Sequence, residues 1–341
     1  MKRILSLVLL ISLFSFFALS AQEAEYPKVN FGGTLYTDYQ FTYNGAAGND
    51  FTLQRMMLKA VGNVSENWKI IALTDVYGTD TVVNETITLS DGTTATTLAR
   101  SPYTMRMNEA SANYTNWGHT FSFGLIKTLW DVPDYSTIWH HRSYTIVPLA
   151  QSGYNMNGSW DLGVSVAGKA GNFLKYMAGV FNGESYLNVG EVDNNKNYQG
   201  RLHFTFAENF NFITGFEVER ATSAADYGIL VPVIAYYDMG WLKPAVNFNF
   251  KTVDGNNDMM IAVVVNSWFA DKKVNPWFGV HYGLASDSGT VTLAENDIKG
   301  YLGLGYNFAK HAKVDLVATY TRDDSADSYN FGIGPFLELA F

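Results

Sequence analysis

Apolar and polar residues alternate along almost the whole chain, and no other property of the sequence limits the possible folds as strongly. The last segment is the clearest case, because one of its faces carries a row of apolar residues: Phe331, Ile333, Pro335, Leu337, Leu339 and Phe341. A period of two residues is typical of a β-strand whose two faces meet different surroundings, and no segment shows a sustained helical period. The chain is therefore predicted to be all-β.

The alternation predicts sixteen strands. They are expected near residues 29–43, 50–64, 67–78, 103–116, 119–129, 158–170, 172–182, 198–207, 209–220, 227–238, 241–252, 259–270, 275–284, 297–308, 312–321 and 329–341. Every second connection is very short, as at 65–67, 207–209 and 309–311, whereas most of the others are longer and polar, notably 79–102 and 130–157. A soluble β-sandwich also alternates apolar and polar residues, but it has no reason to alternate its loop lengths. Bacterial outer-membrane barrels do so, because short turns join their strands at one end and longer loops at the other. The predicted fold is a 16-stranded antiparallel transmembrane β-barrel.

Aromatic residues flank nearly every short connection, which supports the barrel over the sandwich. They are Trp68, Trp117, Phe173, Phe206, Phe210, Trp241, Phe269, Trp277, Phe308 and Phe341. Amphipathic rings prefer the boundary between membrane and water, and barrels carry such girdles where they contact outer-membrane lipid. The terminal Phe341, preceded by an alternating apolar row, resembles the assembly signal of outer-membrane barrels. A further expected partner is therefore the barrel-assembly machinery, which would bind this last strand.

The first 21 residues are predicted to be an export signal. A short basic region, Met1 to Arg3, precedes an apolar stretch over 4–19, and small residues lead to a cleavage position near Ala21. A permanent membrane anchor is the alternative, but the apolar stretch is short and has basic residues on one side only. The expected mature chain is one barrel over 22–341, located in the bacterial outer membrane, with 21 basic residues against 32 acidic ones.

Composition excludes several other classes of protein. A formal charge of −9 is unusual for a nucleic-acid binder, and a chain without cysteine can form neither disulfides nor thiolate metal sites. The adjacent His140 and His141 are a poor metal site because neighbouring side chains seldom converge on one ion. We expect no cofactor and no metal. No serine lies in a nucleophile-elbow sequence, so we expect no catalytic residues and no enzyme, although a barrel-embedded phospholipase stays open as an alternative.

Several short motifs, in their order along the chain, resemble the phosphate-selective porin O and P family. They are Arg55 within 53–58, Asn67-Trp68-Lys69, Asp75, Glu109-Ala110, and the stretches 123–127, 161–164 and 180–183. The resemblance implies a sixteen-stranded porin that is generally a homotrimer. The family's line of lumen arginines and its clustered lysines are not found in this sequence. Phosphate selectivity is therefore not carried over.

Sixteen strands enclose a water-filled lumen, and strand alternation predicts which side chains face it. A charge on the lipid face costs about 2–4 kcal/mol for Arg or Lys at mid-depth, so charged residues opposite the apolar faces are expected inside. These are Arg55, Lys59, Asp75, Glu109, Asp161, Lys169, Arg201, His203, Glu217, Lys243 and Lys251.

The long connection 130–157 is expected to narrow the lumen by folding into it. Four of its residues between positions 130 and 144 are aromatic, which a loop exposed to solvent does not need. The charged and polar candidates for this constriction are Lys127, Asp131, Asp134, His140, His141 and Arg142, together with Arg55 and Glu109 on the wall. Charges at a constriction set ion selectivity, and the acidity of the chain weakly favours cations. A solvated surface loop is the alternative.

The predicted function is a porin for passive diffusion of small hydrophilic solutes and ions. Two alternatives stay open. One is a channel for a specific oxyanion such as phosphate, a sugar or a peptide. The other is a barrel that serves as an outer-membrane enzyme, adhesin or structural protein.

Overall fold

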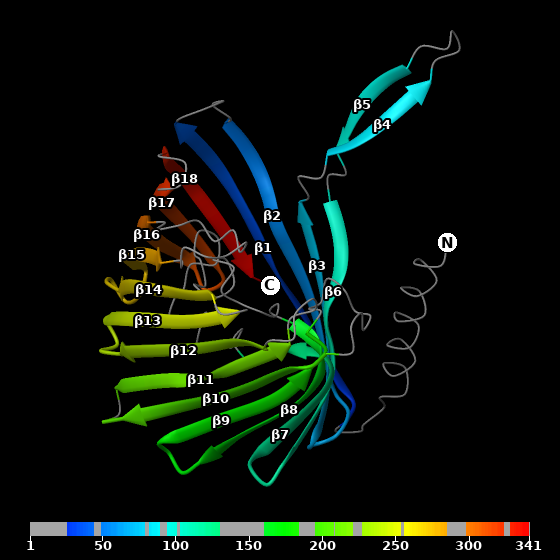
Figure 1. Ribbon diagram of the computed structural model, residues 1–341, viewed down its shortest axis with the longest axis vertical. Coiled ribbons are helices and arrows are strands. Elements are labelled where there is room, and N and C mark those ends of the chain that lie inside the picture. The colour runs from blue at the N-terminus through cyan, green and yellow to red at the C-terminus, as the bar shows by residue number, and fades with distance from the viewer. Residues whose placement is uncertain are drawn as a thin grey trace.

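A computed structural model describes residues 26–43, 49–78, 82–88, 94–100, 103–129, 160–183, 195–207, 209–220, 227–253, 256–284, 298–323 and 328–340. Sixteen strands form one closed antiparallel barrel (Figure 1). They are β1 (Lys28–Tyr43), β2 (Asn49–Asn63), β3 (Trp68–Gly78), β6 (Tyr103–Asn116), β7 (His119–Lys127), β8 (Trp160–Ala170), β9 (Leu174–Phe181), β10 (Asn197–Phe206), β11 (Phe210–Arg220), β12 (Tyr227–Tyr237), β13 (Leu242–Val253), β14 (Asn256–Ser267), β15 (Val274–Leu284), β16 (Ile298–Ala309), β17 (Ala312–Asp323) and β18 (Ser328–Ala340). The predicted strand number and fold class are confirmed.

Strands that follow one another in sequence are neighbours around the barrel, and β1 pairs with β18 to close it. Closure leaves no open edge, so every strand finds hydrogen-bonding partners on both sides. Among the described residues, no helix is long and apolar enough to cross a membrane.

The segment 79–102 departs from the prediction of a long polar loop. It contains a hairpin of β4 (Val82–Thr88) and β5 (Thr94–Arg100), paired as a separate two-stranded sheet. The hairpin stands beyond the barrel wall, and β3 pairs directly with β6 (Figure 1). Its Thr-rich strands carry no continuous apolar face, which explains why alternation did not reveal them.

The barrel is apolar outside and polar inside. Along β13, Phe248 is 36% exposed on the outer face, whereas its neighbours Asn247 and Asn249 are fully buried. Leu302 and Leu304 on β16 are likewise exposed, while Tyr301 on the same strand is buried. This is the reverse of a soluble protein and matches a barrel whose outer face contacts lipid.

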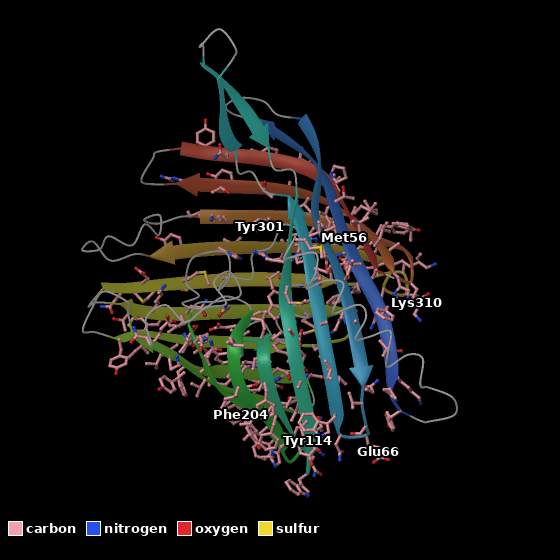
Figure 2. All side chains as sticks on the ribbon, turned by 90° about the vertical axis from the view of Figure 1, so that its right-hand side faces the viewer. Met56, Glu66, Tyr114, Phe204, Tyr301 and Lys310 are labelled. Atoms are coloured by element: carbon pink, nitrogen blue, oxygen red, sulfur yellow. The ribbon has the colours of Figure 1, made fainter. Side chains whose placement is uncertain are left out.

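Most of the predicted girdle aromatics point outward near the short turns. Trp68, whose ring centroid lies 5.0 Å from that of Tyr114, is exposed. Tyr114 and Phe204 lie toward this end of the barrel, as does Lys310 in the turn after β16 (Figure 2). The exposed members of the predicted girdle are Trp68, Trp117, Phe173, Phe206, Phe210, Trp241, Phe269 and Phe308. The prediction for Phe341 lies outside the described residues.

Trp277 is the exception, and its inclusion in the girdle was wrong. It is 2% exposed and packs on the inner face with Tyr301 and Val317. The indole lies over Gly303, where a Cβ atom would overlap the ring. The missing side chain on β16 therefore makes the room that a tryptophan needs inside the barrel.

A two-residue turn joins β6 to β7 through Trp117 and Gly118. Both residues have positive φ, 51° and 80°. Two-residue hairpin turns with positive φ at both positions match the right-handed twist of the strands.

Candidate functional site

The inner wall carries the charged residues that alternation assigned to it. Asp75, Glu109, Asp161, Arg201, His203, Glu217, Lys243 and Lys251 are all buried on the inner face. Lys59 lies opposite Leu73 in the register of β2 and β3, and Lys169 lies opposite Lys175 in that of β8 and β9. Both therefore share the inner face of their strands, although their side chains remain exposed.

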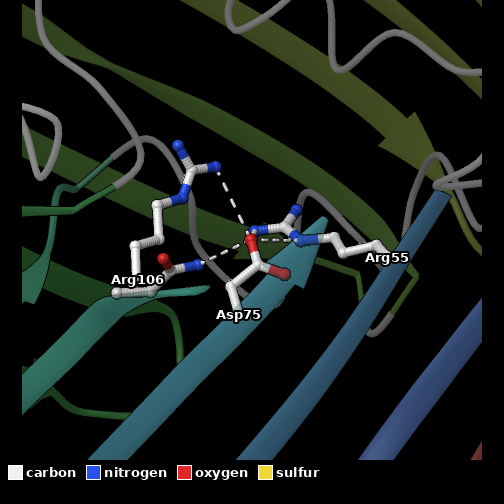
Figure 3. A network of polar contacts seen from close by, with 4 residues as sticks. Arg55, Asp75 and Arg106 are labelled. Atoms are coloured by element: carbon white, nitrogen blue, oxygen red, sulfur yellow. Dashed lines mark hydrogen bonds and ion pairs between the residues drawn. The ribbon is translucent and has the colours of Figure 1, made fainter. Parts of the chain in front are cut away.

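A compact ionic cluster joins three neighbouring strands at Asp75, which is fully buried. The Asp75 Oδ2 atom accepts a hydrogen bond from Arg55 Nε at 2.8 Å and lies 2.7 Å from Arg55 Nη2 (Figure 3). Arg106 Nη2 lies 3.5 Å from the same oxygen, and Asn108 Nδ2 donates to it at 3.3 Å. One carboxylate thus holds two guanidinium groups side by side on the lumen wall.

Arg106 and Asn108 were missed from the sequence because β6 contains a β-bulge. Leu73 pairs with Glu109 and the next residue, Thr74, pairs with Met107, so Asn108 is the extra residue. A bulge reverses the alternation on one side of it. Asn108 and Glu109 are therefore both buried, and Arg106 rather than Met107 joins Asp75.

Trp160 links this cluster to Lys127. Its ring centroid lies 5.9 Å from the Arg55 guanidinium carbon and 5.4 Å from Lys127 Nζ. Cations over an indole face are stabilised by the negative potential of the ring. The tryptophan is 3% exposed and packs within an inward apolar cluster with Tyr36 and Phe336. Arg55, Lys127 and Glu109, which the sequence proposed for the constriction, therefore belong to one sector of the wall.

The chain turns into the lumen directly after β7. Leu129 is fully buried, and its backbone N–H donates to Gln199 Oε1 on β10 at 2.8 Å. Strands β8 and β9 lie between β7 and β10, so the chain passes inside the wall to reach Gln199. Leu129 packs there against Ile126 and Phe181.

A glycine within β7 has an unusual backbone conformation. Gly124 has φ of 103°, and a Cβ atom there would overlap the carbonyl oxygen of Ala110. Residues other than glycine rarely adopt this backbone conformation. The predicted constriction residues Asp131, Asp134, His140, His141 and Arg142 lie outside the described residues.

A second polar network occupies the wall at β10 and β11. Asn197 Nδ2 donates to Glu217 Oε1 at 2.8 Å and to Glu219 Oε2 at 2.7 Å, and Gln199 Nε2 donates to Asn197 Oδ1 at 2.9 Å. Side-chain amides donate to these carboxylates, whereas guanidinium groups surround Asp75. The two networks present different charge to any solute between them. Among the described side chains, no group of three or more His, Asp or Glu could hold a metal ion.

Comparison with solved structures shows the fold. OmpT, an outer membrane protein of Vibrio cholerae, in a form lacking loop L8, matches with a TM-score of 0.63 and 16% identity over 92% of this chain and 99% of that one. The Salmonella typhi OmpF structure with daunomycin matches with a TM-score of 0.66 and 11% identity over 92% and 98%. The outer membrane channel DcaP of Acinetobacter baumannii matches with a TM-score of 0.64 and 13% identity over 94% and 99%.

These matches show that the chain has the fold of a sixteen-stranded outer-membrane β-barrel. An anion-selective porin from Comamonas acidovorans also shares it, with a TM-score of 0.64 and 10% identity over 93% of this chain and all of that one. No protein-family model matches the sequence, and neither does any curated protein. The comparisons thus support the type of barrel that the resemblance to the phosphate-selective porin O and P family implies, and they do not confirm that family.

Proposed function

We propose that the protein is a porin of the bacterial outer membrane, through which small hydrophilic solutes and ions diffuse passively. The observation that carries the proposal is the inverted distribution of side chains on a closed sixteen-stranded barrel. The outer face is apolar, and buried charged and amide groups line the inner face. Barrels of this size enclose an aqueous channel.

We further propose that the connection after Leu129 continues into the lumen and narrows it. The hydrogen bond from the Leu129 N–H to Gln199 supports this, because the chain has already left the wall there. The narrowed passage would be bordered by Arg55, Arg106 and Lys127. Fixed charges at a constriction act on ions at close range. Replacing Arg55 with glutamine is expected to move the reversal potential toward cation preference.

Reconstitution in a planar bilayer tests the porin function. Refolded protein should produce stepwise conductance, and liposomes that contain it should swell in solutions of small sugars. Far-UV circular dichroism would establish in parallel that the sample is β-sheet. Folded protein that gives neither conductance nor swelling would refute the proposal.

A channel specific for an oxyanion is the second candidate, and the paired guanidinium groups of Arg55 and Arg106 favour it. Guanidinium forks match the geometry of phosphate and carboxylate. Blockade of a chloride current by low concentrations of phosphate would identify such a channel. A general porin would show no saturable block.

Several finer features belong to the same proposal. We propose a homotrimer, as in the trimer form described for Vibrio cholerae OmpT, to be tested by the migration of unheated samples in detergent gels. The signal peptide is proposed to be removed after Ala21, which the N-terminal sequence of the exported protein would show. We propose no catalytic role, and detectable phospholipase activity of the pure barrel would contradict this.

A further inference from the structure

The two ends of the barrel differ in charge. We propose that this difference polarises the pore along its axis, so that each channel passes more current when the side of the long connections is positive. The inference rests on the proposed porin function and adds a directional property to it. The basic residues of the short-turn mouth would determine that property.

The short-turn end is basic at the ends of its strands. Counting the two terminal residues of each of the sixteen strands at this end gives six lysines and no acid. The lysines are Lys28, Lys69, Lys169, Lys175, Lys243 and Lys313. The same count at the opposite end gives four acids and four bases: Asp50, Asp161, Glu219 and Asp323 against Lys127, Arg220, Lys299 and Arg322.

Two of these lysines face each other without a compensating acid. Lys169 on β8 is the direct register partner of Lys175 on β9, which in turn lies opposite His203 on β10. Like charges directly opposite one another destabilise a sheet. Among the residues that the structure describes, neither Lys169 nor Lys175 forms an ion pair, whereas Lys243 and Lys313 do. The sheet retains this repulsion between the two lysines, which indicates that their positive charge has a role of its own.

The same lysines border a hollow of about 250 Å³ at the mouth. Arg201 and His203 also line it, and none of the described residues that line it is acidic. The exposed ammonium groups of Lys169 and Lys175 therefore act on ions in water rather than on buried partners. Anions are expected to be concentrated at this mouth.

By sequence, the connections that join strands at the other end are acidic. The connections that join strands there, from 44–48 to 324–327, contain fifteen acidic and three basic residues. Cations are expected to be concentrated near acidic connections. When the side of the long connections is positive, cations enter at the acidic mouth and anions enter at the basic mouth. Both fill the pore and raise its conductance, whereas the reverse voltage empties it.

Single-channel recordings of the wild type test the proposal. The Debye length is about 10 Å at 0.1 M salt and about 3 Å at 1 M, so the mouth charges control ions across the opening only in dilute salt. Currents at equal positive and negative voltage should differ at 0.1 M and become equal at 1 M. Because the chain has no cysteine, an Asn67→Cys variant labelled with an impermeant maleimide reports which side the short turns face.

Charge variants locate the origin of the asymmetry. The double variant Lys169→Gln with Lys175→Gln should lose most of the rectification at 0.1 M. The matched control replaces two lysines near the long connections, Lys196→Gln with Lys299→Gln. It should keep the rectification or increase it, because it makes the acidic end more acidic. Circular dichroism and unheated gel migration establish that each variant is folded.

The outcomes separate the two proposals. Folded wild-type protein without conductance would refute the porin function, and this inference with it. Conductance with symmetric currents at 0.1 M would leave the porin function standing and overturn the polarised pore. Rectification of unchanged size in the Lys169 and Lys175 double variant would also overturn it, since the basic mouth would then not be its source.

Discussion

Two basic regions of the inner wall differ in whether a carboxylate compensates their positive charges. Around Asp75, the guanidinium groups of Arg55 and Arg106 converge on a carboxylate that is fully buried. At the short-turn mouth, Lys169 and Lys175 face each other in the register with no carboxylate beside them and with exposed side chains. Water screens the second pair but not the first, so a partner is required only where the wall is buried.

The comparison predicts that the two regions respond very differently to the loss of one charge. Asp75→Asn would leave two guanidinium groups beside each other with no carboxylate. Removing one partner of a buried ion pair costs about 3–5 kcal/mol, so we expect a loss of about 3 kcal/mol of unfolding free energy. Urea titration of the folded barrel in lipid vesicles would measure it. Lys169→Gln is the control and should change the stability by less than about 0.5 kcal/mol, as exposed charges do.

Gly124, close to the Arg55 region, occupies a backbone conformation in β7 that favours glycine. Gly124→Ala should destabilise the barrel by about 1–3 kcal/mol, because a Cβ at φ of 103° would overlap the Ala110 carbonyl. Gly62→Ala is the matched control, since no atom lies within 4 Å of the position of its Cβ. It should be neutral or slightly stabilising. Equal urea midpoints for the two variants would contradict the role given to Gly124.

Reversing one charge at the mouth should relieve its repulsion. Lys169→Glu places an opposite charge directly across from Lys175, and such cross-strand pairs contribute about 0.2–1 kcal/mol. We therefore expect a small increase in unfolding free energy. A decrease would show that the two lysines do not repel each other in the folded barrel.

The ion pair between Asp238 and Lys243 gives the smallest expected effect. Burial acts to raise the pKa of the Asp238 carboxyl, but hydrogen bonds from Lys243 and the Gly240 N–H, together with the Lys243 charge, hold the pKa below its ordinary value of 3.8. The stabilisation is therefore present above pH 3.8 and is lost as the pH falls through the lower pKa of the folded protein. Because the Asp238 side chain is 40% exposed, the loss should be no more than about 0.5 kcal/mol. Unfolding of wild type and Asp238→Asn between pH 5 and pH 3 would measure it, and equal pH dependence of the two would contradict it.

Much of the barrel was predictable because alternation is a local property. The apolar row through Leu339 and the polar row through Asn247 and Asn249 could each be predicted from a single strand, because its two faces meet different surroundings. The site was less predictable. Asp75 and Arg55 could be assigned to the inner face, but Arg106 could not, because the bulge at Asn108 reverses the alternation between Glu109 and Arg106.

The amino-acid sequence by itself determined the two-faced strands, their number, and the difference between the short and long ends, since these follow from residue periodicity and turn chemistry. The tertiary structure decided which strands meet and what their side chains find there. It placed Trp277 inside over Gly303, turned Leu129 toward Gln199, and set Lys169 opposite Lys175. These features depend on register and packing between strands, which are defined only when the segments of the chain pair in the closed barrel.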